Sequence, residues 1–223
     1  AHTAPHSRIP ASHLHFSGPL LPRSPLTMLI PQVQVRESTI AGHGLYVVEP
    51  IRAGTVVWKA EPDEDKYVVH RSVVESWPED KKKEFLCVAY QVDEEHWSGV
   101  PEGVESDGSE YMNHSCDPNV VFRDENGTEM IATRDLEVGE EVTYDYATSE
   151  VESSSHLPMK CLCGSSHCRG EVTGSDYLLP SLRERYDGHF LAFLVRRQKA
   201  ADAANAGDAA AGAEAEAAEE GTL

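Results

Sequence analysis

Three cysteines within one octapeptide constrain this chain more than any other feature of its sequence. The stretch CLCGSSHC, residues 161–168, places Cys161, Cys163 and Cys168 in a C-x-C-x4-C pattern beside small, flexible residues. Three thiolates so close together suit a soft, tetrahedral metal ion such as zinc. A closed structural zinc site needs a fourth ligand. The candidates for it are His167, Cys87, Cys116 or a water molecule.

The cysteine count also bears on the cellular setting. The chain has five cysteines, an odd number, and its N-terminal stretch lacks the apolar segment of a secretory signal. This combination favours an intracellular, reducing compartment, where clustered thiols bind metal more often than they form disulfides. Cys87 lies on the apolar side of an expected helix, which favours a core position over a role as a ligand.

The charge balance limits the classes of partner. The chain has 38 Asp and Glu residues against 19 Lys and Arg, for a net charge of −19. A phosphate backbone would repel such a surface, so direct nucleic-acid binding is disfavoured, whereas Lys- and Arg-rich proteins or peptides suit it. No stretch approaches the roughly 20 apolar residues that a membrane helix needs, so no membrane association is expected.

The first part of the chain differs in composition from the rest. Residues 1–31 are rich in His, Pro and Ser, and no acidic residue occurs before Glu37. We expect a disordered tail here, compatible with an organellar transit segment or with vector-derived sequence ahead of a natural start at Met28. These residues are excluded from the expected fold.

Short apolar runs separated by turn residues dominate the remainder and predict a mainly β fold with a helical insert. Two turns are marked by their residues, Ala53-Gly54 and Asn126-Gly127, and the second dipeptide is the strongest short signal of a hairpin. Strands are expected within residues 33–49, 51–60, 119–134 and 141–146.

Helices are expected in an acidic middle segment and near the end of the chain. Residues 70–77 and 78–92 have helical periodicity, and an acidic, Gly-punctuated loop is expected at 93–110. Residues 149–155 have the composition of a Ser-rich linker. The Ala/Glu-rich tail, residues 200–223, is of low complexity and is expected to be disordered.

A second dense group of polar residues is NHSCDPN, residues 113–119. Three roles are open to Cys116 within it. The thiol can be a nucleophile served by His114, a ligand to a metal, or an ordinary buried side chain. The residues of this stretch alone do not choose among these roles.

Four stretches, in order, carry a resemblance to a known family. They are GHGLY (42–46), YMNHSCDPN (111–119), EVTYDY (141–146) and CLCGSSHCRG (161–170). GHGLY alone is weak, but NHSCDPN is specific and the ordered set is very specific. Over roughly residues 32–172 the chain resembles the SET-domain protein lysine methyltransferases with a post-SET zinc segment. More loosely, its helical end is similar to that of small stand-alone SET proteins found in microbes.

The resemblance implies a fold and a division of the chain. The fold is a β-clip of short, curved sheets with a pseudoknot, in which the segment ending in TYDY threads beneath the loop that carries NHSC. A post-SET zinc loop and a C-terminal helix follow it. The expected division is an N-terminal tail (1–31), a SET domain (32–148) with an insert at about 61–110, a post-SET zinc segment (157–173), a helical extension (174–199) and a disordered tail (200–223).

The reaction implied is transfer of a methyl group from S-adenosylmethionine to a lysine ε-amine of a basic protein, such as a histone tail. By resemblance, Asn113 and His114 bind the methionine part and the adenine, and Gly44 lets the backbone approach the cofactor closely. Leu162 is expected to cover the adenine. The full set implied for the cofactor is His43, Gly44, Leu45, Asn113, His114, Tyr146 and Leu162.

Three tyrosines are implied for the reaction itself. Tyr146 matches the catalytic tyrosine of the family, which orients the amine and supports the methyl group through weak CH···O contacts. Tyr144 stands where the family has Phe or Tyr, and its hydroxyl takes space beside the amine. We therefore expect mono-methylation, or di-methylation, rather than tri-methylation. Tyr90 is the candidate for a further wall of the lysine channel.

The resemblance also selects among the candidates for the metal. It implies one structural zinc ion held by Cys116, Cys161, Cys163 and Cys168. The sequence departs from the family just before Asn113, where Glu110 stands at the usual basic position. In a eukaryote, a nuclear location is expected, or an organelle if the acid-free N-terminus is a transit segment.

Two other functions compete with this one. A cysteine-dependent hydrolase using Cys116 and His114 is disfavoured, because neighbours two apart on a loop seldom face each other and no third group orients them. A catalytically inactive, zinc-stabilised module that binds basic peptides is the stronger alternative. It would use the acidic stretch 61–110, which holds fifteen Asp and Glu against five Lys and Arg.

Overall fold

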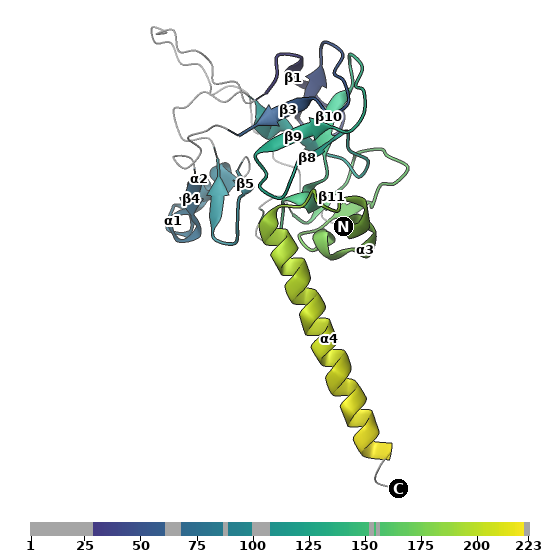
Figure 1. Cartoon of the computed structure of the whole chain (residues 1–223). Helices are drawn as coiled ribbons and strands as arrows, with labels where there is room; N and C mark the ends of the chain where they lie inside the picture. The colour runs from purple at the N-terminus through teal and green to yellow at the C-terminus, as the bar shows by residue number, and fades with distance from the viewer. Residues whose placement is uncertain are drawn as a thin grey trace, which may run out of the picture.

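The computed structural model describes residues 29–60, 68–86, 89–99, 108–151, 154 and 157–220, with the side chains of the last helix described through residue 207. Within these ranges, short strands form four small sheets, and a long C-terminal helix extends away from them (Figure 1). None of the helices in this part of the chain is both long and apolar enough to span a membrane. Small sheets with few helices and a C-terminal helix agree with the predicted fold class.

The first sheet contains most of the residues singled out in the sequence. Its strands, in order across the sheet, are β1 (Val33–Glu37), β2 (His43–Val47), β10 (Glu141–Tyr144) and β7 (Asn113–His114). β10 runs antiparallel to β2 but parallel to β7, with Thr143 opposite Asn113 and Tyr144 opposite His114. The sheet therefore brings GHGLY, NHSC and TYDY side by side.

A second sheet forms the hairpin expected at Asn126-Gly127. Its strands are β3 (Val56–Lys59), β9 (Glu129–Ala132) and β8 (Val120–Phe122). Gly127 has a φ of 68°, the left-handed region that favours glycine. A Cβ there would lie 2.4 Å from Cδ2 of Leu191, so the turn also packs closely against the C-terminal part of the chain.

The insert differs from the sequence-based expectation. Two short helices are present, α1 (Arg71–Glu75) and α2 (Glu79–Leu86). The helix expected over 78–92 stops at Leu86, and the loop expected at 93–110 includes a strand. The third sheet consists of β4 (Val68–His70), β6 (His96–Ser98) and β5 (Tyr90–Gln91).

Tertiary pairing explains this difference. α2 carries charged side chains on most of its surface and buries none of its residues, so helical periodicity in this stretch had little to pack against. Trp97 on β6 instead packs with Val74 and Ala89 in a small cluster separate from the main core. Pairing to this strand overrides the local helical tendency of residues 90 and 91. Cys87 lies outside the described residues.

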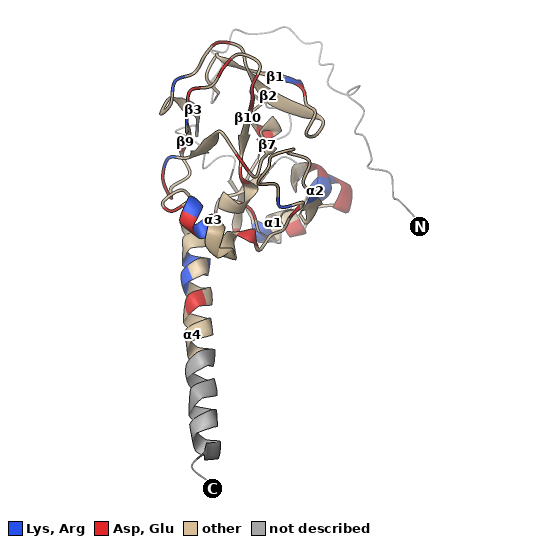
Figure 2. Cartoon of the chain, turned by 90° about the vertical axis from the view of Figure 1, so that its right-hand side faces the viewer, with Lys and Arg blue, Asp and Glu red and all other residues tan. Residues whose placement is uncertain are grey.

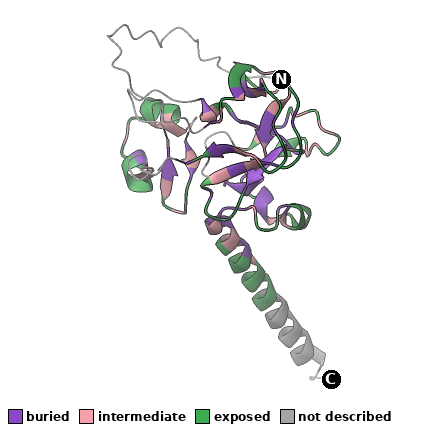
Figure 3. Ribbon diagram, turned by 45° about the horizontal axis from the view of Figure 1, so that its top comes forward, coloured by how far each residue is buried: buried purple, intermediate pink, exposed green. Residues whose placement is uncertain are grey.

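The main core lies between the first two sheets and the C-terminal segments. Figure 3 shows buried residues concentrated in the strands and in the first turns of the last helix, α4 (Ala192–Glu220). The remaining helical segments are η3 (Ser109–Tyr111), η4 (Tyr146–Thr148), η5 (Asp176–Leu178) and α3 (Pro180–Arg185). Fully buried side chains include Leu45, Val57, Val120, Leu136, Val142, Phe193 and Leu194.

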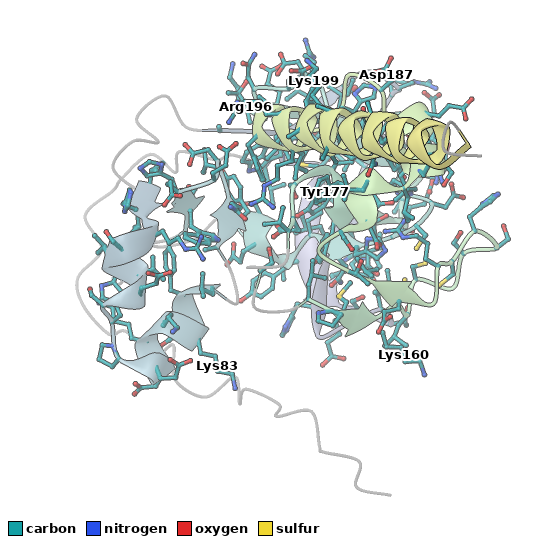
Figure 4. The ribbon with its side chains drawn as sticks, turned by 90° about the horizontal axis from the view of Figure 1, so that it is seen from below. Lys83, Lys160, Tyr177, Asp187, Arg196 and Lys199 are labelled. Atoms are coloured by element: carbon teal, nitrogen blue, oxygen red, sulfur yellow. The ribbon has the colours of Figure 1, made fainter. Side chains whose placement is uncertain are left out.

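The start of α4 is anchored at two points, and the rest projects. Gln198 donates a hydrogen bond to the carbonyl of Tyr177 at 2.8 Å, and Figure 4 labels Tyr177 beside the helix. Arg196 pairs with Glu94 of the insert at 2.8 Å. The structure differs from the disordered tail expected at 200–223, because α4 continues to Glu220. Alanine has the highest helix propensity, which lets an Ala-rich segment extend a helix already anchored by packing.

Candidate functional site

Four cysteine sulfurs converge in this structure. Those of Cys116, Cys161, Cys163 and Cys168 all lie within 4.8 Å of one another. The distance between the sulfurs of Cys116 and Cys161 is 3.7 Å. A tetrahedral ion with metal–sulfur bonds of about 2.3 Å holds its four sulfurs about 3.8 Å apart, so this spacing fits zinc. His167 is exposed, and the ligand set among the described residues consists of the four thiols.

Local hydrogen bonds preorganise these sulfurs. The strands β11 (Met159–Lys160) and β12 (Glu171–Val172) pair, and the loop between them carries three of the cysteines. The backbone N–H of Arg169 donates to the sulfur of Cys116 at 3.3 Å, and that of Gly170 to the sulfur of Cys168 at 3.4 Å. Burial raises the pKa of the Cys116 and Cys161 thiols. A cation among the four sulfurs would favour their charged form, as the donor set requires.

His114 connects this cluster to the TYDY segment. Its imidazole is buried, and Nδ1 accepts a hydrogen bond from the backbone N–H of Tyr146 at 3.2 Å. The proton of a neutral ring therefore sits on Nε2, which lies 3.3 Å from the sulfur of Cys116. Nδ1 is also 3.6 Å from a carboxylate oxygen of Asp145. That contact is not an ion pair in this tautomer, because Nδ1 carries no proton.

Contact between His114 and Cys116 corrects one argument from the sequence. Neighbours two apart were expected not to face each other, yet these two do, because β7 ends between them and the chain turns. A nucleophilic role gains nothing from this contact. Cys116 is only 1% exposed and is surrounded by three other thiols, so a substrate has no path to its sulfur.

Asp145 is held by a buried ion pair that the sequence did not reveal. Two nitrogens of Arg169 reach its two carboxylate oxygens at 2.7 and 2.8 Å. The same guanidinium reaches Asp176 at 3.0 Å. The Asp145 side chain is fully buried, and that of Arg169 is 15% exposed. Arg169 follows Cys168 directly, so this pair ties the cysteine loop to the residue between Tyr144 and Tyr146.

Asn113 is fixed by a second carboxylate. Its amide nitrogen donates to Glu141 at 2.7 Å and to the backbone carbonyl of His43 at 2.9 Å. Glu141 also accepts hydrogen bonds from Ser38 and Tyr46. A Cβ at Gly44 would lie 2.1 Å from a carboxylate oxygen of Glu141, so a larger residue there would displace this side chain from its hydrogen bonds.

The three tyrosines lie together. The rings of Tyr144 and Tyr146 are 4.9 Å apart, and Tyr90 is close enough to Tyr144 to affect its titration. The hydroxyl of Tyr146 donates to the carbonyl of Met112 at 3.1 Å. The pKa of Tyr144 is raised well above the usual range. Burial of the Tyr144 hydroxyl is the main cause, and the nearby Glu150 carboxyl is the second. All three tyrosine side chains are partly buried.

The remaining predicted cofactor residues lie around this centre. His43 and Leu45 are on β2, with Leu45 fully buried and His43 packed against Tyr111 at 5.4 Å between ring centres. Leu162 is 56% exposed between two of the cysteines. Leu162 and His43 thus lie on the periphery of the site. Leu162 is beside the four cysteines, and His43 is beside Asn113.

Comparison with known proteins accords with this geometry. The family model described as "SET domain" matches residues 42–147. Residues 42–147 of the chain therefore form a SET domain. The cysteine loop that follows this domain and completes the cluster is consistent with a post-SET zinc segment.

Several curated proteins are similar to this SET domain and its flanks. A histone-lysine N-methyltransferase, H3 lysine-4 specific, of Cryptococcus neoformans is 33% identical over 62% of this chain and 10% of its own length. Human histone-lysine N-methyltransferase 2B is 31% identical over 61% of the chain and 5% of its length. The methyltransferase flvH of Aspergillus flavus is 38% identical over 34% of the chain and 42% of its length. The chain therefore spans between 5% and 42% of the lengths of these relatives.

Sequence reasoning missed four charged residues of this SET domain site: Glu141, Asp145, Glu150 and Arg169. Each is an ordinary acidic or basic residue in the sequence. Glu141, Asp145 and Arg169 have partners far along the chain. Glu150 has local partners, and its burial is not apparent from the sequence. One signal was available for Asp145. A carboxylate fixed between two tyrosines of TYDY needs a cation or hydrogen-bond donors if the segment is buried.

Replacing Arg169 by Met would leave the Asp145 carboxylate buried without its cation. We expect the free energy of unfolding to fall by about 3–5 kcal/mol, because removing one partner of a buried pair leaves an uncompensated charge. Adding Asp145→Asn should restore part of this loss. Urea unfolding of both single variants and the double variant gives the coupling energy.

The matched control is Arg52→Met, which removes the exposed partner of Asp135. Its unfolding midpoint should stay within error of the unmodified protein. If Arg52→Met and Arg169→Met lowered the free energy of unfolding equally, the larger contribution assigned to the buried pair of Arg169 and Asp145 would be contradicted.

Proposed function

We propose that this protein is an S-adenosylmethionine-dependent protein-lysine N-methyltransferase. The observation that carries this proposal is the parallel pairing of β7 with β10 inside the SET domain, which sets Asn113 and His114 beside Tyr144 and Tyr146. The relatives, which are mostly named histone-lysine methyltransferases, support the same activity. The pairing also supports the expected pseudoknot, in which TYDY passes beneath NHSC.

S-adenosylmethionine supplies the methyl group, and the residues near β2 and β7 would hold it. We assign its carboxylate and amine end to the backbone of residues 43–45, at the start of β2. Asn113, fixed by Glu141, presents a preorganised amide at this end. His114 would contribute through its backbone, since both ring nitrogens contact other groups of the protein. Leu162 is free of core packing on one side and suits the cover of the adenine.

Tyr146 suits a positioning role at the methyl group. Its hydroxyl donates to the Met112 carbonyl, which directs the remaining lone pair of the oxygen elsewhere. That lone pair can accept weak CH···O contacts from a methyl group on a sulfonium. An ordinary phenol, with a pKa of about 10, is a poor proton acceptor at neutral pH, so alignment of amine and methyl is the larger contribution.

Methyl transfer is the direct test. The purified protein should transfer label from S-adenosylmethionine to a member of a histone and basic-peptide panel, with sites mapped by mass spectrometry. Tyr146→Phe should lower the rate constant for transfer by about 10²-fold or more, while calorimetry finds cofactor binding little changed. Tyr177→Phe, beside α4, is the matched control and should keep its activity.

Two results would count against this proposal. Binding of basic peptides without any methyl transfer would favour the inactive, zinc-stabilised module. Full activity of Tyr146→Phe would contradict the role of this hydroxyl.

The product is proposed to be mono-methyl-lysine, with di-methylation as the upper limit. The Tyr144 hydroxyl lies in the tyrosine cluster, where it takes space beside the amine. Tyr144→Phe should shift the products toward di- and tri-methyl-lysine, read from the mass of intact peptide over a time course. Efficient tri-methylation by the unmodified protein, or an unchanged product ratio in Tyr144→Phe, would contradict this assignment.

We propose one structural zinc ion at the four-cysteine cluster. Metal analysis should find about one zinc per chain. Removal by a strong chelator should lower the thermal midpoint and abolish methyl transfer together, because folding and metal binding are coupled at such sites. Adding zinc back should restore both. Activity that survives complete removal of zinc would contradict a structural role for the cluster.

Substrate and location are proposed from charge and from the relatives. Acidic residues are spread over helices and loops, and on α2 they flank a run of three lysines (Figure 2). With a net charge of −19, the chain suits a lysine within a basic segment. Several relatives are named for histone H3, so histone tails head the panel, followed by other basic proteins. In a eukaryote we expect a nuclear location.

A further inference from the structure

A buried carboxyl lies next to the tyrosine cluster, and the proposed mechanism has so far given it no role. Glu150 is 3% exposed and follows η4, where its backbone N–H donates to the carbonyl of Tyr146. One of its carboxyl oxygens accepts a short hydrogen bond from Ser154. The other lies 3.5 Å from the hydroxyl oxygen of Ser149. In the part of the chain that the structure describes, none of the ion pairs includes Glu150.

Ser149 connects this carboxyl to Tyr144. The Ser149 hydroxyl, itself fully buried, lies 3.4 Å from the hydroxyl of Tyr144. Both of its contacts are at the long end of the hydrogen-bond range, as catalytic contacts often are before substrate binds. A hydroxyl can donate one proton while accepting another, so the three groups form a continuous row.

The environment of Glu150 keeps its two protonation states close in free energy. Burial raises the pKa of Glu150 to about 7, and hydrogen bonds from Ser154 and Ser149 partly offset this effect. The titratable groups on the side of Ser149 are Tyr144 and, beyond it, Tyr90 and Tyr146. An ionised Glu150 can therefore exist at neutral pH, and it faces neutral hydroxyls.

We infer that Glu150 is the proton acceptor for the substrate lysine, reached through the hydroxyls of Tyr144 and Ser149. This rests on the proposed function. A free lysine ammonium, with a pKa of about 10.4, cannot attack a methyl group until it loses a proton. The other carboxyls of the described site already have strong partners. Glu141 binds the Asn113 amide, and Asp145 pairs with Arg169.

The proton steps balance as follows. The ammonium gives a proton to the Tyr144 oxygen, which passes its own to Ser149, which passes its own to Glu150. The neutral amine then forms the new N–C bond as the S–C bond of the sulfonium breaks, and the electron pair stays on sulfur. The carboxyl loses its proton to bulk water before the next turnover.

This relay is tested by how the ratio of two methyl-transfer rates, that of the unmodified protein and that of Glu150→Gln, changes with pH. Single-turnover rates of the unmodified protein and of Glu150→Gln are measured across pH with saturating cofactor and peptide. Well below the pKa of Glu150 the carboxyl is protonated and cannot accept, so the two proteins should have similar rates. Well above it, the unmodified protein should be faster by about 10²-fold or more. The cationic substrates lower this pKa in the complex, so the divergence should begin below about 7.

Ser149→Ala is the second variant, in case Glu150→Gln folds poorly. It interrupts the row while keeping the carboxyl, and it should give the same divergence with pH. Glu140→Gln is the matched control, because that carboxylate lies on an exposed turn and pairs with Arg134. Its ratio to the unmodified protein should stay near one at every pH. Tyr144→Phe is unsuitable here, since a water molecule in the vacated space can bridge to Ser149.

A purely structural role for Glu150 would give a ratio that does not change with pH, and this result would overturn the relay while methyl transfer persists. Equal rates of Glu150→Gln and the unmodified protein above about 7 would also overturn it. Absence of methyl transfer by the unmodified protein is a different result. It would overturn the proposed function and the relay together.

Discussion

The parallel contact between β7 and β10 is the interaction on which the rest of this site depends. β7 is only two residues long, and a strand so short cannot hold its place through its own ladder. Asn119 supplies what is missing. Its side chain donates to the carbonyl of Glu141 and accepts from the N–H of Thr143, while its backbone N–H donates to the Thr143 carbonyl. One amide side chain thus clamps the turn after NHSC to β10.

The cysteine cluster acts on the same contact from the other side. Cys116 lies two residues beyond His114, and the Arg169 N–H meets the sulfur of Cys116 while its guanidinium meets Asp145. The loop that carries three of the thiols is therefore bound to both partners of the β7–β10 pair. Arg185 adds a further tie from α3 to the carbonyl of Cys116 at 2.8 Å. A metal ion here would stabilise the pairing of β7 with β10 without taking part in chemistry.

Structure that is determined by neighbouring residues could be predicted from the sequence. Structure that depends on contacts between residues far apart in the chain could not. The hairpin at Asn126-Gly127 and the grouping of the loop cysteines follow from local chemistry. The strands β5 and β6 do not, because each is too short to have a pattern of its own. Residues 149–155 have the composition of a linker, yet Ser149, Glu150, Val151 and Ser154 are buried. Their burial comes from tertiary packing, which places Val151 in the main core and which composition does not encode.

Three carboxyl groups from one ten-residue segment, those of Glu141, Asp145 and Glu150, lie in three different environments. We therefore assign each of them a different role. Glu141 accepts hydrogen bonds from Asn113, Ser38 and Tyr46, which hold its carboxylate in place as a fixed acceptor. Asp145 is neutralised by Arg169 and therefore contributes structure. Glu150 alone is buried with hydroxyl partners and no cation among the described groups. Burial raises its pKa to about 7. A carboxyl kept in a different environment from its neighbours is a usual candidate for an acid–base role. On this reasoning, the residue best placed to exchange a proton near neutral pH lies four positions after Tyr146, the tyrosine that we propose for the methyl group.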